Sequence, residues 1–177
     1  IVIDPSWDLE KLTEIINEQN LNPKYIVNTH WHDDHTRGNE DLAKELSVKI
    51  VQHSASQLKN DLTVSDGDSI KFGCSELAVY HTPGHSKDGI CLVGDGKIFS
   101  GDTLFVGNCG RIDLPGGSAK ELYHGLFDVI ANLSDDLVLY PGHDYGSSST
   151  STIGKEKQTN PVMQKMSENE FVERMGG

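Results

Sequence analysis

Apolar residues recur along this chain with two different spacings. Three segments carry them three and four residues apart, which is the spacing of a helix with one buried face. These segments predict helices over 8–20, 39–47 and 118–132. Shorter apolar runs, bounded by Gly, Pro or polar residues, predict strands. The predicted strands lie over 1–3, 25–27, 48–51, 69–72, 76–81, 90–93, 97–100 and 137–139.

The order of these elements favours an α/β (α+β) fold. Helical patterns flank the clusters of strands on both sides, as in a sandwich of sheets between outer helices. The pair Asp95-Gly96, between two of the apolar runs, predicts a tight hairpin turn. The length suits one domain over residues 1–177, which is enough chain to bury a single core.

The N-terminus begins inside a strand pattern. Ile1-Val2-Ile3 is already a buried-strand run with no initiating Met, so we expect an N-terminal truncation. No apolar run approaches the ~20 residues of a membrane helix, and no basic start marks a signal peptide. We expect a cytoplasmic protein without a membrane partner. The three cysteines, an odd number at wide spacing, suit a reducing compartment.

The net charge and the apolar residues near the C-terminus limit the kinds of macromolecular partner that we expect. The formal net charge at pH 7 is −12. A nucleic-acid-binding surface needs clustered Lys and Arg, which this sequence lacks, so no nucleic-acid partner is expected. The apolar residues near the C-terminus are expected to pack on the body of the chain or on a second copy in a homo-oligomer. They are Met166, Phe171, Val172 and Met175.

The strongest chemical signal follows the apolar run 25–27. Residues 29–35 read Thr-His-Trp-His-Asp-Asp-His. Neutral imidazoles and a carboxylate are the ligands that zinc and ferrous iron prefer, and a short loop leaving a strand can aim several of them at one point. The segment therefore predicts half of a metal site. Its candidate ligands are His30, His32, Asp34 and His35.

Three further motifs supply matching ligand types, each after a predicted strand. They are Thr-Pro-Gly-His, Ser-Gly-Asp-Thr and Tyr-Pro-Gly-His-Asp, and they contribute His85, Asp102 and His143. Loops at strand ends are where a rigid scaffold presents reactive groups. The remaining histidines are expected to have no special role; they are His53, His81 and His124.

The segment from His30 to His35 resembles the His-x-His-x-Asp-His signature of the metallo-β-lactamase-fold superfamily, and the resemblance runs over nearly the whole chain. It implies a four-layer αββα sandwich, here without the first strands that the family usually places ahead of residue 1. It implies two divalent ions, zinc in the first place and iron as the alternative. The implied ligands are His30, His32 and His85 for one ion and Asp34, His35 and His143 for the other, with Asp102 bridging them.

Two metals sharing Asp102 would activate a bound water. A zinc-bound water has a pKa near ~7 rather than ~16, so hydroxide forms at neutral pH without a protein base. Asp34 would both bind metal and orient the hydroxide, which makes Asp34 and Asp102 the candidate catalytic residues. No cysteine lies in a recognisable nucleophile motif.

Residues 101–111 resemble both the glyoxalase II-like thioester hydrolases and the persulfide dioxygenases of this superfamily. We expect a metal-dependent hydrolase that cleaves a hydroxyacyl thioester or related thiol conjugate. Arg111 is expected to grip an anionic group of this substrate, because a guanidinium binds carboxylate through two hydrogen bonds. A structural Arg111–Asp113 pair is the alternative. Tyr145 is the second candidate substrate-binding residue.

Two other functions stay open. A mononuclear non-haem iron persulfide dioxygenase, acting on glutathione persulfide or a similar small persulfide, would use His30, His85 and Asp102 and leave the second site empty. A metal-binding protein of this fold that lacks catalysis is the third possibility. Metal identity and stoichiometry discriminate between these functions.

Overall fold

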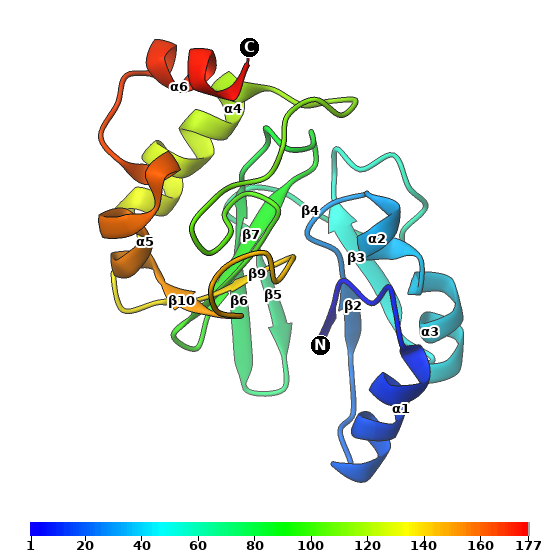
Figure 1. Ribbon diagram of the computed structural model, residues 1–177. Coiled ribbons are helices and arrows are strands. Elements are labelled where there is room, and N and C mark those ends of the chain that lie inside the picture. Colours follow the sequence, from blue (N-terminus) through cyan, green and yellow to red (C-terminus); the bar gives the residue numbers. More distant parts are fainter. Residues whose placement is uncertain (177) are drawn as a thin grey trace.

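The computed structural model describes residues 1–176, which form two β-sheets stacked face to face (Figure 1). The first sheet is parallel, in the order β1 (Val2–Ile3), β2 (Tyr25–Val27), β3 (Lys49–His53), β4 (Leu62–Val64). The second sheet is antiparallel except for its β8–β9 pair. Its order is β10 (Ser151–Thr152), β9 (Val138–Pro141), β8 (Lys97–Gly101), β7 (Ile90–Gly94), β6 (Ser75–His81), β5 (Ser69–Phe72).

Helices cover the outer face of each sheet (Figure 1). The first sheet carries α1 (Leu9–Glu18), α2 (Asp33–Thr36) and α3 (Asn39–Leu46). The second carries α4 (Ala119–His124), which continues through a π-helical turn (Gly125–Val129) and a 3₁₀ turn (Ile130–Asn132). It also carries α5 (Ile153–Thr159), a 3₁₀ turn (Pro161–Met163) and α6 (Glu168–Met175).

Successive side chains of each strand point to opposite faces of its sheet. One core therefore lies between the two sheets, and a further core lies under each helical layer. On β2, Val27 packs in the core that joins the two sheets, while Ile26 packs against Leu42 of α3. On β7, Leu92 packs between the sheets and Cys91 faces the helices. Successive side chains of a strand point to opposite faces, so buried strands read as continuous apolar runs. The predicted four-layer αββα sandwich is confirmed.

The predicted elements differ from the observed ones mainly at their ends. Asp95 and Gly96 have φ angles of 47° and 71°, which the predicted two-residue hairpin turn requires. The helix predicted over 118–132 is helical from Ala119 to Asn132, although its middle turn is π-helical. Phe171 is fully buried with its ring edge-on against Tyr123, and Met166 and Met175 pack against the same core of the chain.

Several short elements were absent from the prediction. They are α2, β4, β10, α5 and α6. The Ser-rich stretch after 147 includes strand β10, and its Thr152 side chain caps α5 by accepting from the Lys155 N–H. Helix α6 begins with a capping box of Ser167 and Glu170, a signal that the sequence does contain. Within residues 1–176, no helix combines the length and apolar character that a membrane span needs.

Candidate metal centre

Parallel strand directions bring the predicted ligands to one edge of the sandwich. Strands β6, β8 and β9 run in the same direction, so the loops that follow them meet at one end. These loops carry His85, Asp102 and His143. On the other sheet, β1 and β2 are parallel, and the segment after β2 carries His30, His32, Asp34 and His35. The seven side chains that the motifs singled out therefore lie together.

The atoms of the predicted ligands form two groups, and a third possible group joins Asp4 to His30 and His35. In the first, atoms of His30, His32 and His85 lie within 4.8 Å of one another, and His85 Nε2 is 2.9 Å from His32 Nδ1. In the second, atoms of Asp34, His35 and His143 lie within 4.8 Å of one another. There His143 Nε2 lies 3.2 Å from His35 Nε2 and 3.4 Å from an Asp34 oxygen.

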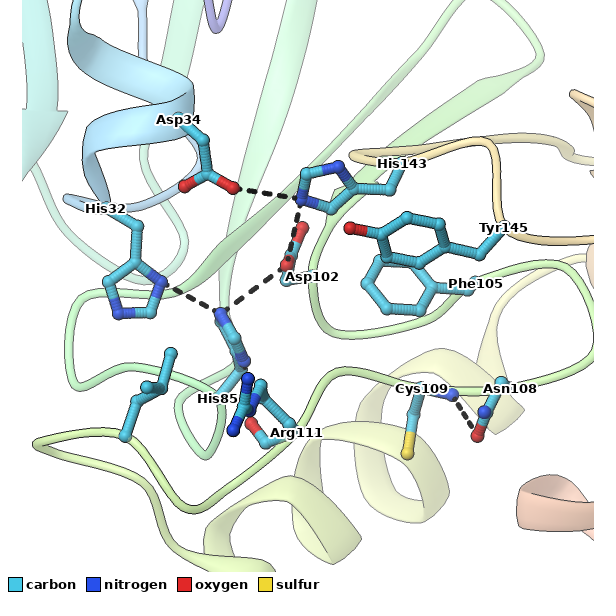
Figure 2. A pocket seen from close by; sticks show the side chains of 11 residues that line it. His32, Asp34, His85, Asp102, Phe105, Asn108, Cys109, Arg111, His143 and Tyr145 are labelled. Atoms are coloured by element: carbon cyan, nitrogen blue, oxygen red, sulfur yellow. Dashed lines mark hydrogen bonds and ion pairs between the residues drawn. The ribbon is translucent and has the colours of Figure 1, made fainter.

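Asp102 lies between the two groups (Figure 2). Its Oδ2 is 3.4 Å from His85 Nε2 in the first group and 3.5 Å from His143 Nε2 in the second. Its Oδ1 is 3.4 Å from His35 Nε2. A carboxylate in this position can bind an ion in either group or connect two.

Two buried atoms at this centre lack a hydrogen-bond partner among the described residues. They are His30 Nε2 and Asp102 Oδ1. Leaving a buried polar atom unpaired costs roughly 1–3 kcal/mol, so folded proteins rarely keep one without a ligand or water. Imidazole nitrogens and a carboxylate oxygen are the ligand types that divalent cations such as zinc and ferrous iron bind. The fold and these clusters therefore support divalent metal binding.

Hydrogen bonds from residues around the candidate ligands set the tautomers of three of the imidazoles. His35 Nδ1 donates to Asp4 Oδ2 at 3.0 Å, and His85 Nδ1 donates to the Arg111 carbonyl at 2.7 Å. The Thr29 hydroxyl donates to Asp4 at 2.6 Å, so it accepts from His30 Nδ1 at 3.1 Å. Each of these histidines keeps its Nε2 lone pair for a metal, an arrangement that strengthens metal ligation.

Asp4, which was not among the residues predicted from the sequence, hydrogen-bonds to the candidate ligand His35 and to Thr29. It follows β1 directly, and its carboxylate also accepts from the Thr29 backbone N–H at 2.7 Å. One carboxylate thus orients an imidazole in each ligand group, His30 through Thr29 and His35 directly. The only signal in the sequence was its position directly after the apolar run 1–3.

Burial and charge set the protonation of the site. Burial lowers the pKa of His30 well below its usual range, and burial beside His85 lowers the pKa of His32. Both imidazoles are therefore neutral at neutral pH, the form that binds metal. Burial also opposes protonation of His35, but the hydrogen bond and charge of Asp4 outweigh it and raise the pKa. A hydrogen bond to Asp102 raises the pKa of His143.

Two glycines permit the close approach of the site loops. A Cβ on Gly142 would lie 2.4 Å from Asp102 Oδ1 and 2.9 Å from His35 Cε1. A Cβ on Gly110 would lie 2.1 Å from the Asp102 carbonyl and 2.9 Å from His85 Nδ1. Both contacts are shorter than real Cβ contacts, which explains why the motifs before His143 and Arg111 contain glycine.

A cavity of about 370 Å³ opens over the centre. Beside the ligands, its wall contains Phe105, Asn108, Cys109, Arg111, Leu114 and Tyr145 (Figure 2). The Tyr145 ring stacks on the His143 imidazole at 4.7 Å and 8°, and 71% of the tyrosine is exposed. Both predicted substrate-binding residues therefore line the cavity.

Arg111 has a carboxylate partner within the chain. Its Nε and one terminal nitrogen each lie 2.5 Å from an Asp113 oxygen, and this pairing holds the pKa of Asp113 down to about 2. The pair is exposed. An anionic substrate group would therefore have to share or replace Asp113.

The other candidate nucleophiles and bases lie outside the centre or are unreactive. Burial raises the pKa of Cys91 to about 11 and that of Cys109 to about 12, so both are neutral thiols. His53 stacks on His81 with ring centroids 3.9 Å apart, and His124 pairs with Asp128. None of these residues carries a ligand atom of either group.

Comparison with known proteins places these features in a family. The model of the Metallo-beta-lactamase superfamily matches residues 1–57 and 54–143. The human mitochondrial persulfide dioxygenase ETHE1 is 37% identical over 180 residues, which cover 99% of this chain and 70% of the relative. A hydroxyacylglutathione hydrolase of Tolumonas auensis is 38% identical over 150 residues, which cover 82% of this chain and 57% of the relative.

A solved structure agrees with these sequence matches. The crystal structure of ETHE1 from Myxococcus xanthus superposes with a TM-score of 0.94 at 31% identity, covering 99% of this chain and 78% of that one. The relatives include both the dioxygenase and the glyoxalase II branches that residues 101–111 resemble. On this agreement of sequence and fold, the chain belongs to the metallo-beta-lactamase superfamily.

Proposed function

We propose that this chain is a mononuclear non-haem iron dioxygenase that oxidises a low-molecular-weight persulfide. Relatives named persulfide dioxygenase match 99% of its length, whereas the Tolumonas hydrolase matches 82%. This proposal reverses the order that the sequence analysis favoured, in which thioester hydrolysis came first. The enzyme is still a metal-dependent member of the superfamily in either case.

One structural observation carries the proposal. His30 and His85 offer ligand atoms within 4.8 Å of each other, and Asp102 Oδ2 lies 3.4 Å from His85 Nε2, which gives a set of two histidines and one carboxylate. In this set His30 Nε2 and Asp102 Oδ1 are buried without a hydrogen-bond partner among the described residues. Three ligands of this kind are typical of non-haem iron oxygenases, because they leave coordination positions open. A ferrous ion bound there would supply the means to bring dioxygen and a thiolate sulfur together.

The remaining residues of the cavity would hold the persulfide. We assign Arg111 to a carboxylate of the thiol carrier, for which a guanidinium offers two parallel hydrogen bonds. Tyr145, stacked on His143, presents its ring and hydroxyl to the same cavity. In this proposal, Asp34, His35 and His143 act beside the metal as hydrogen-bonding groups rather than as ligands.

Thioester hydrolysis is the second candidate function. The observation that favours it is the complete second group, in which atoms of Asp34, His35 and His143 lie within 4.8 Å of one another. With a second ion, zinc or iron, this group would support a metal-bound hydroxide near neutral pH. Asp34 and Asp102 would then serve as the catalytic residues predicted from the sequence.

The test compares both reactions on one preparation. The protein is purified anaerobically, its zinc and iron contents are measured, and portions are reloaded with either metal. Oxygen uptake on glutathione persulfide and cleavage of S-lactoylglutathione are then followed for each portion. The proposal predicts oxygen uptake by the iron form alone, with thioester cleavage slow or absent. Thioester cleavage by a protein with about two metals per chain, without oxygen uptake, would overturn it.

A further inference from the structure

A buried carboxylate that belongs to neither ligand group, Glu156, hydrogen-bonds to the turn that forms part of the cavity wall. Glu156 of α5 is 1% exposed. Its oxygens accept from the Gly107 backbone N–H at 2.8 Å, from the Ser151 hydroxyl at 2.5 Å and from Asn160 Nδ2 at 2.9 Å. A buried carboxylate is costly unless such donors surround it. The chain therefore maintains this cluster at the cost of desolvating Glu156.

Asn160, which belongs to the same cluster, binds both ends of the turn formed by residues 105–108. It is fully buried, and its Nδ2 also reaches the carbonyls of Phe105 and Asn108, at 3.2 and 3.1 Å. Those two residues close the turn themselves, because the Phe105 N–H donates to the Asn108 carbonyl at 2.8 Å. Gly107 supplies the positive φ of 79° that the turn needs.

This turn forms one wall of the cavity, between Asp102 and Arg111 in the chain. Phe105 contacts His143 and Tyr145 edge-on, with centroid distances of 5.9 and 5.5 Å. A Cβ on Gly146 would lie 2.6 Å from Val106 Cβ, so the loop that carries Tyr145 packs closely on the turn. A shift of the turn would therefore move the cavity wall and the aromatic rings beside the metal centre.

We infer that Glu156 and Asn160 are positioning residues for the substrate cavity. They fix the Phe105–Asn108 turn from behind and touch neither substrate nor metal ligands. The C-terminal segment thereby sets the shape of the wall that receives the substrate. The inference rests on the proposed function only for the identity of that substrate, since the cavity serves either candidate reaction.

The test compares three variants of the metal-loaded protein. Asn160→Asp removes the Nδ2 donor, and Glu156→Gln weakens the acceptor. Lys157→Met is the matched control, because Lys157 ties the same helix to the Leu133 carbonyl and Asp135, away from the cavity. Kinetics are measured on whichever substrate, glutathione persulfide or S-lactoylglutathione, the unaltered protein turns over. Misplacing binding groups by ~1 Å can cost about 100-fold in rate. We therefore expect kcat/KM to fall at least about tenfold in the two cluster variants, mainly through a higher KM, while their metal content stays unchanged.

A second readout needs no substrate. Cys109, directly after the turn, and Cys91, on β7, are both buried in the core under helices α4–α6, whereas Cys74 is exposed. Releasing the turn should speed labelling of Cys109 by a thiol reagent about tenfold or more, because lost buried hydrogen bonds shift a local opening equilibrium by that factor. Cys91 should stay protected, and Cys74 serves as the internal standard.

Equal labelling of Cys91 and Cys109, or kinetics indistinguishable from those of Lys157→Met, would show a merely structural cluster and overturn the inference. If Asn160→Asp does not fold, Ser151→Ala provides a milder variant, since it removes only one donor to Glu156. Because the labelling result does not depend on turnover, it stands whether or not the proposed reaction is correct.

Discussion

Asp4 and His35 are separated by 31 residues, yet His35 Nδ1 donates to the Asp4 carboxylate at 3.0 Å. The parallel pairing of β1 with β2 creates this contact, because both side chains lie beyond the same end of the sheet. Through Thr29, Asp4 also orients His30. Asp4, whose carboxylate also lies within 4.8 Å of ligand atoms of His30 and His35, therefore aligns one imidazole in each of the two predicted ligand groups.

The first prediction concerns this alignment. Asp4→Asn should weaken metal binding about 10–100-fold, the usual cost of losing such a supporting carboxylate. The measurement is a competition titration against a chelator with known metal affinity. Asp8→Asn is the control, since Asp8 is exposed and makes no side-chain cap bond. Unchanged affinity in Asp4→Asn would show that Asp4 does not support the ligands.

The second prediction concerns Gly142. Its replacement by Ala should displace Asp102 or His35, because the new Cβ would approach their side chains to 2.4 and 2.9 Å. Metal content should fall and turnover should drop at least about 100-fold, as expected for a site displaced by ~1 Å. Gly96→Asn is the control, because nothing lies within 4 Å of its Cβ position and Asn tolerates a positive φ. A fully metal-loaded, active Gly142→Ala protein would contradict the close approach of these loops.

The third prediction separates the two interpretations of Arg111. If its guanidinium binds the substrate carboxylate, Arg111→Lys should raise KM for glutathione persulfide about tenfold with little change in kcat, because a lysine cannot form the two parallel bonds. Arg37→Lys is matched to it, since Arg37 makes a similar exposed pair with Asp33 away from the cavity. Equal KM values in both variants would leave Arg111–Asp113 as a structural pair only.

The fourth prediction concerns acid sensitivity. Burial, with a smaller contribution from His81, lowers the pKa of His53 to about 4. The unfolded chain, with a histidine pKa of about 6.5, therefore binds a proton where the folded one does not. The His53 contribution should be constant above pH ~6.5, should lower stability as the pH falls towards about 4, and should level off below that value.

Urea unfolding of the metal-free protein at several pH values between 7 and 4 measures this effect. His53→Gln should unfold with a shallower pH dependence than the unaltered protein. The same slope in His53→Gln as in the unaltered protein would show that His53 does not contribute.

The clustering of the seven candidate ligands was predictable from the sequence because each ligand motif follows an apolar strand. Strand ends are recognisable locally, and parallel strands bring such ends together. Asp4 occupies an equivalent position, but one aspartate after a strand is not distinctive. Its importance appears only when β1 pairs with β2 and places it beside His35.

The Glu156–Asn160 cluster could not be predicted from local pattern. Helix α5 has seven residues, and its polar Glu156 is buried where it meets the 105–108 turn, 49 residues from Gly107 in the chain. Burial of a polar side chain is decided by tertiary contacts rather than by periodicity. The same holds for β10, whose two residues are a strand only through pairing with β9.

The most direct test of a mononuclear centre asks whether His30, His85 and Asp102 suffice without the second group. Iron content and persulfide-dependent oxygen uptake are measured for His143→Ala and His85→Ala. We expect His143→Ala to keep about one iron per chain and measurable oxygen uptake, whereas His85→Ala should lose both. Loss of iron and uptake in His143→Ala as complete as in His85→Ala would contradict a mononuclear centre and return the two-metal hydrolase to first place.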